Sequence, residues 1–133
     1  AAVIERGKEA GAKRVVQLEV SGPFHSSLMR PAAERLAEAL GAVTFRDAAV
    51  PVVANVHARP VTAGDELRRL LVDQVVSPVL WEDSIRFLLE EGVDTFVEIG
   101  SGTVLAGLIR KIDKSVRVVS VNGADAVRAF VAG

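Results

Sequence analysis

Apolar residues switch between two periodicities along this chain, and the switching constrains its fold more than any other feature. Residues 95–99 and 116–121 have the short apolar pattern of strands, and residues 104–112 between them carry apolar side chains at helical spacing. A strand, a helix and a second strand joined by short connections favour parallel pairing. The sequence therefore predicts an α/β fold in which a parallel sheet is flanked by helices.

The other expected elements follow the same two patterns. Further strands are predicted over 14–20 and 51–56, and residues 1–10 are predicted to end a helix that Gly11 closes. Helices are also expected over 27–40, from a Thr62–Asp65 capping box to Pro78, from Trp81 to Gly92, and over 124–131.

The composition limits the classes of function. Half of the 133 residues are hydrophobic and the mean hydropathy is +0.32, which indicates either a very apolar core or apolar surface that belongs against a partner. The net charge of −1 gives no indication of nucleic acid or a membrane surface as partner. No stretch approaches the ~18 apolar residues of a membrane span, and the acidic Glu5 argues against a signal peptide. The absence of cysteine rules out disulfides and fits the cytoplasm.

His25 is the first candidate for chemistry. It follows the turn Ser21-Gly22-Pro23 after the strand predicted over 14–20, and open α/β sheets place their sites at the carboxyl ends of strands. Imidazole suits a general base near neutral pH. From the residues alone, a histidine that is structural or merely exposed remains an alternative.

Two other features have plainer interpretations. The Gly100-Ser101-Gly102 turn could bind an anion at a helix N-terminus, but Leu105 stands where a dinucleotide fingerprint needs glycine. A tight turn is the favoured interpretation. His57 is expected to be a solvated loop residue, and two histidines without matching carboxylates predict no metal site.

Four ordered motifs resemble malonyl-CoA:acyl carrier protein transacylases. Gly-Pro-Phe-His-Ser-Ser-Leu-Met at 22–29, followed by Pro-Ala-Ala, is similar to that family's catalytic-histidine segment. The likeness extends over essentially the whole chain, because further matches occur in order at 50–56, 71–81 and 98–105. The resemblance implies that residues 1–20 end a ferredoxin-like small subdomain. Residues 21–133 would be the C-terminal part of an α/β-hydrolase-like large subdomain.

The resemblance also implies a reaction. A serine in a Gly-His-Ser-x-Gly elbow attacks the malonyl thioester, and His25 takes the serine's proton and returns it to the departing thiol of coenzyme A. His25 then activates the phosphopantetheine thiol of the acyl carrier protein. Malonyl-CoA and the carrier protein are substrates, and no cofactor or metal is expected.

Two more site residues come from the resemblance. The backbone carbonyl of Gln74 is expected to hold the His25 ring and fix its tautomer, so that Gln74→Ala should have little effect through the side chain. Phe24 is expected to favour malonyl over methylmalonyl, since an aromatic ring there fills the space of an α-methyl group. A packed core phenylalanine is the alternative.

The elbow serine is missing from this chain. None of its eight serines lies in a Gly-x-Ser-x-Gly pattern, and neither Ser26 nor Ser27 is expected to be the nucleophile because adjacent side chains rarely aim at each other. We therefore expect an N-terminal half of the same enzyme as a further partner. A polyketide synthase acyltransferase segment, a non-catalytic interaction module of the same fold and an unrelated α/β domain are the alternatives.

Overall fold

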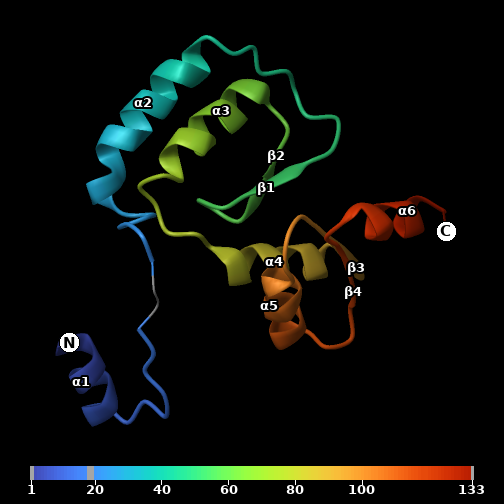
Figure 1. The fold of residues 1–133 in the computed structure, drawn as a ribbon. Coiled ribbons are helices and arrows are strands. Elements are labelled where there is room, and N and C mark those ends of the chain that lie inside the picture. Colours follow the sequence, from blue (N-terminus) through green and yellow to red (C-terminus); the bar gives the residue numbers. More distant parts are fainter. Residues whose placement is uncertain (1, 18–19, 133) are drawn as a thin grey trace.

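The computed structural model describes residues 2–17 and 20–132, which form an α/β arrangement of short elements (Figure 1). The helices are α1 Ala2–Glu9, α2 Arg30–Gly41, α3 Gly64–Asp73, α4 Trp81–Glu90, α5 Val104–Ile112 and α6 Ala124–Ala132, with a 3₁₀ turn, η1, at Ser27–Met29. The strands are β1 Val52–Ala54, β2 Arg59–Val61, β3 Thr95–Ile99 and β4 Arg117–Val121.

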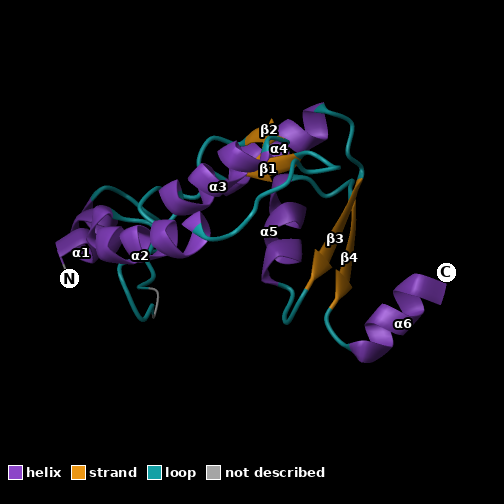
Figure 2. Cartoon of the chain, turned by 90° about the horizontal axis from the view of Figure 1, so that it is seen from above, coloured by secondary structure: helices purple, strands orange, loops and turns teal. Residues whose placement is uncertain are grey.

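The β3–α5–β4 unit confirms the expected parallel pairing. β3 and β4 pair in register from Thr95 with Arg117 to Ile99 with Val121. One face of the pair carries Glu98 and Ser120 toward α5, and α6 lies on the other side of the pair (Figure 2). Parallel strands are normally covered on both faces, which explains the near-continuous apolar sequence of β4.

The second sheet departs from the expectation of a single parallel sheet. β1 pairs antiparallel with β2, and a turn over residues 55–58 joins the two strands. β2 was not expected, because Arg59 and Pro60 lack an apolar alternation. Proline is tolerated on this short ribbon because an edge strand leaves one of its sides without ladder bonds.

The start of α3 corrects the capping-box prediction. The helix begins at Gly64, its N-cap Ala63 makes no side-chain hydrogen bond, and the Gly64 N–H donates instead to Oδ1 of Asp47 at 2.8 Å. A Cβ on Gly64 would lie 2.6 Å from the carbonyl oxygen of Phe45. Close approach of residues 45–47, rather than local sequence, therefore determines where this helix begins.

The remaining predicted element boundaries are partly confirmed and partly wrong. Gly11 and Gly92 both have φ of +84° at the ends of α1 and α4, as expected for glycines that close helices. The helix predicted over 27–40 opens with the η1 turn instead. The strand predicted over 14–20 is wrong for residues 14–17 and 20, which are irregular, and its residues 18 and 19 lie outside the described part of the chain.

The chain leaves much more surface exposed than a self-contained domain of its size. Its accessible surface is 10018 Å², whereas a folded monomer of 14.1 kDa is expected to expose about 6,700 Å². Among the described residues no large side chain is less than 2% exposed. Exposed apolar side chains include Leu28, Ile99, Val104 and Val131. No helix in the described ranges is long and apolar enough to cross a membrane.

We expect the 133-residue chain to self-associate or unfold without a sharp transition, because its apolar surface has no covering layer. Sedimentation velocity and thermal unfolding would measure both properties. A monodisperse monomer that unfolds cooperatively would contradict this expectation.

Candidate active site

His25 lies in a turn with an unusual backbone conformation. Its φ is +58°, in the left-handed region, where a non-glycine residue is held at a cost of roughly 1 kcal/mol. The turn is held by the Ser26 hydroxyl, which donates to the carbonyl of Pro23 at 2.6 Å, and by the Met29 N–H, which donates to the carbonyl of Ser26 at 3.0 Å. Such strained positions are frequent at functional sites.

The imidazole of His25 contacts the main chain of a residue 49 positions away. Nδ1 lies 2.8 Å from the carbonyl oxygen of Gln74. A carbonyl only accepts, so Nδ1 carries the proton in this contact. In the neutral ring, Nε2 then keeps its lone pair and can accept a proton from another group. The roles of both residues in catalysis remain predictions.

Gln74 occupies the C-cap position of α3, directly after Asp73. The last carbonyls of a helix have no partner within the helix, and the helix dipole places partial negative charge at this end. The Gln74 oxygen is therefore well suited to receive the imidazole N–H. His25 was expected at the end of a strand, but the structure places it at the end of this helix.

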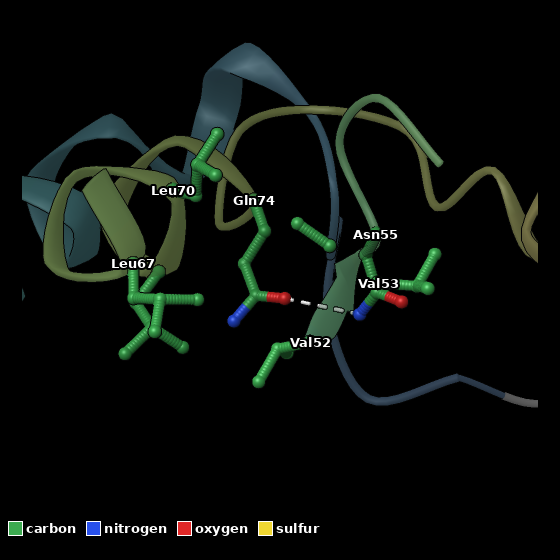
Figure 3. Close-up of a pocket in the computed structure, with 8 residues that line it drawn as sticks. Val52, Val53, Asn55, Leu67, Leu70 and Gln74 are labelled. Carbon is green, nitrogen blue, oxygen red and sulfur yellow. Dashed lines mark hydrogen bonds between the residues drawn. The ribbon is translucent and has the colours of Figure 1, made fainter. Parts of the chain in front are cut away.

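The Gln74 side chain also has a partner, which the sequence analysis missed. Nδ2 of Asn55 donates to Oε1 of Gln74 at 3.1 Å, as drawn in Figure 3, and the backbone carbonyl of Asn55 accepts the N–H of Leu80 at 2.9 Å. Both residues border a hollow of about 320 Å³ between β1 and α3. The motif at 50–56 contained Asn55, but no local pattern indicated its contact with Gln74.

Phe24 is 55% exposed, so it is not a packed core residue of this chain. A Cβ on Gly22 would lie 3.4 Å from the ring of Phe24, an ordinary contact distance, so the ring folds back over the turn that precedes it. The exposed ring directly precedes His25 in the chain, and its role in acyl selection remains a prediction.

Among the described residues, no serine side chain forms a hydrogen bond with the His25 ring. The Ser26 hydroxyl is directed to the Pro23 carbonyl, and none of the eight serines hydrogen-bonds the imidazole. Over residues 2–17 and 20–132, no cluster of three histidine or acidic side chains could hold a metal ion.

The N-terminus of α5 is occupied by a carboxylate of the chain itself. Oε1 of Glu98 accepts the Leu105 N–H at 3.0 Å, and Oε2 accepts the Ala106 N–H at 3.1 Å and the Ser120 hydroxyl at 3.3 Å. Gly100 and Gly102, in the turn that joins β3 to α5, have φ of +139° and +87°. The structure therefore favours the tight turn over an anion-binding site.

We expect Glu98→Ala to lower the hydrogen-exchange protection of the Leu105 and Ala106 amides roughly tenfold, because it removes the acceptor for both. Glu98→Gln keeps one acceptor oxygen and should lose less. Glu90→Ala, at an exposed position of α4, is the matched control. Equal protection in Glu98→Ala and Glu90→Ala would contradict the capping role.

Comparisons with known proteins agree with the motifs. No family model matches the chain. A malonyl CoA-acyl carrier protein transacylase of Bacillus subtilis is 48% identical over 127 residues, which are 96% of this chain and 40% of that protein. The crystal structure of acyl-carrier-protein-S-malonyltransferase from Bartonella henselae matches 98% of this chain and 42% of its own, with a TM-score of 0.89 and 40% identity.

A third match is a malonyl-transacylase solved in complex with its type II PKS acyl-carrier protein. It is 37% identical, has a TM-score of 0.85, and is matched over 97% of this chain and 42% of its own. The present chain thus spans about two fifths of the length of the relatives it matches. Almost all of this chain aligns with these relatives. The chain therefore belongs to the malonyl CoA-acyl carrier protein transacylase family and corresponds to its C-terminal portion.

Proposed function

We propose that this chain is the base-bearing portion of an enzyme that transfers malonyl groups from coenzyme A to acyl carrier protein in fatty acid synthesis. The observation that carries the proposal is the 2.8 Å contact between Nδ1 of His25 and the Gln74 carbonyl, within a segment homologous to malonyl transacylases. The contact leaves Nε2 as the atom that exchanges protons with the reacting groups.

The reaction proceeds in two balanced steps. A serine hydroxyl from the N-terminal portion attacks the thioester carbonyl, and Nε2 of His25 takes the serine proton and delivers it to the sulfur of coenzyme A as the C–S bond breaks. In the second step Nε2 takes the thiol proton of the carrier's phosphopantetheine arm, whose sulfur attacks the malonyl-serine ester. The proton then returns to the serine oxygen. Gln74 keeps the ring in the tautomer that both steps require.

The serine would come from the portion of the enzyme that precedes this chain in its relatives. Support for this partner comes from the absence of a Gly-x-Ser-x-Gly pattern and from the exposed apolar surface. Residues 1–20 would end a small subdomain and residues 21–133 would belong to the large one. The described part of α1 buries no side chain against the rest, which is compatible with this division. We place the enzyme in the cytoplasm.

We expect the chain alone to transfer no malonyl group, and a fusion to the N-terminal portion of the Bacillus subtilis relative to do so. His25→Ala in the fusion should lower kcat/KM at least about a hundredfold, because it removes the base. Transfer of radiolabelled malonyl from coenzyme A to carrier protein is the measurement, and His57→Ala is the control. Comparable transfer by the unfused chain, or full activity in the His25→Ala fusion, would refute the proposal.

Phe24 is proposed to select the acyl group. In the same fusion, Phe24→Ser should lower the preference for malonyl over methylmalonyl roughly tenfold, since one methyl group is discriminated by about 1–3 kcal/mol. Phe130→Ser, at a similarly exposed ring on α6, is the matched control. An unchanged ratio of the two products in Phe24→Ser would remove Phe24 from the site.

A polyketide carrier protein is a second candidate acceptor. The solved transacylase in complex with its type II PKS acyl-carrier protein favours it, because that enzyme matches this chain along 97% of its length. Parallel assays of the fusion with carrier proteins of fatty acid and polyketide synthesis would distinguish the two acceptors.

A further inference from the structure

We propose that Asn55 is a positioning residue for the base: its side chain holds Gln74 so that the Gln74 carbonyl selects the Nδ1–H tautomer of His25. The inference rests on the proposed function for its catalytic meaning, but the contacts that carry it lie within this chain. Asn55 touches no reacting group and acts through the side chain of Gln74. The proposal therefore replaces the expectation that Gln74→Ala has little effect through its side chain.

The Gln74 carbonyl needs an external anchor. It follows the last residue of α3, and residues 74–76 form turns rather than helix. The same oxygen can also accept the N–H of Ser77, at a long 3.4 Å. The Gln74 oxygen thus has two partners, the Ser77 N–H within its own turn and the His25 ring, and the proposal assigns its direction toward the ring to Asn55.

Asn55 restrains the segment between α3 and α4 at both of its ends. Its side chain donates to Oε1 of Gln74 at 3.1 Å, and its backbone carbonyl accepts the N–H of Leu80 at 2.9 Å. The side-chain contact is partly buried, where loss of a partner is more costly than at the surface. Figure 3 shows Asn55 and Gln74 extending toward one another from two different elements.

Asn55 is itself held in a rigid turn. The N–H of Ala58 donates to the carbonyl of Ala54 at 2.9 Å, and Ala58 adopts φ of +53° while only 8% exposed. The β1–β2 register fixes the two ends of this turn. The β1–β2 hairpin thus positions Asn55, Asn55 positions Gln74, and Gln74 positions the imidazole of His25.

Nitrogen NMR of the His25 ring tests the proposal in the fusion to the N-terminal portion of the Bacillus subtilis relative, where the exposed apolar surface has a partner, at a pH where the imidazole is neutral. We expect the proton on Nδ1 in the unsubstituted fusion. Asn55→Ala should lower the ratio of Nδ1–H to Nε2–H roughly threefold to tenfold, the range of one net hydrogen bond. An unchanged ratio in Asn55→Ala, or a proton on Nε2 in the unsubstituted fusion, would overturn the proposal.

Carboxylate variants test the same bond at nearly constant volume, and they remain informative if Asn55→Ala does not fold. Asn55→Asp leaves an amide donor on Gln74, which can turn over, and Gln74→Glu leaves the donor on Asn55. Each should keep the Nδ1–H tautomer. The double variant has two carboxylates and no donor, and it should lose that tautomer. Retention of the tautomer in the double variant would refute the proposal.

His57→Ala is the matched control, because His57 lies in the same turn and accepts the Arg59 N–H at 3.1 Å without contacting Gln74. It should leave the His25 ratio unchanged. An effect as large as that of Asn55→Ala would mean general loosening of the turn and would overturn the proposal.

The activity of the fusion separates this inference from the proposed function. Asn55→Ala should lower kcat/KM for malonyl transfer by the same threefold to tenfold. A fusion without any transfer would defeat the proposed function, while the NMR ratios would still decide whether Asn55 positions the ring. Full activity in a fusion whose NMR ratio has changed would refute the positioning role in catalysis.

Discussion

One hydrogen bond, from Nδ1 of His25 to the carbonyl of Gln74, links the two parts of the chain that the site requires. It joins an exposed turn before η1 to the end of α3, 49 residues later. Neither partner is positioned by its neighbours in sequence alone. The turn at His25 depends on Ser26 and Pro23, and the end of α3 depends on contacts from β1 and its turn. The geometry of the site is therefore a property of the tertiary fold.

The acceptor for the imidazole is a neutral amide rather than a carboxylate. A carboxylate that is buried beside the ring carries a desolvation cost, whereas a carbonyl at a helix terminus brings partial negative charge that the fold already contains. The disadvantage is that a backbone oxygen moves with its peptide plane. The hydrogen bond between Asn55 and the side chain of Gln74 is proposed to limit this movement.

Local patterns predicted the elements whose formation depends on local spacing. The strands near 95–99 and 117–121 and the helix over 104–112 followed from apolar periodicity, and Gly11 and Gly92 marked helix ends correctly. Features decided by distant contacts were missed. The cap of Gly64 by Asp47 and the short strand at 59–61 have no local signal strong enough to outweigh Thr62 or Pro60.

The same distinction holds for the site. His25 was a candidate from the turn that precedes it, whereas Gln74 was named only through the family resemblance. Residue patterns alone could not have joined two positions so far apart. Asn55 belonged to a matched motif, but nothing in the sequence indicated a role for it. Its contact with Gln74 is evident only in the structure. No serine of the chain hydrogen-bonds the imidazole, in agreement with the absence of a Gly-x-Ser-x-Gly pattern from the sequence.

The left-handed backbone at residue 25 has a consequence for the descent of this sequence. Glycine enters that region without strain and histidine, asparagine and aspartate do so at modest cost, while β-branched and bulky residues do so at considerable strain. Selection on the turn and selection on the imidazole therefore act on the same position for different reasons. If His25 is the proposed base, a descendant freed from the chemistry would drift first toward asparagine or glycine, and such residues would mark a lineage that kept the shape of the loop after abandoning proton transfer.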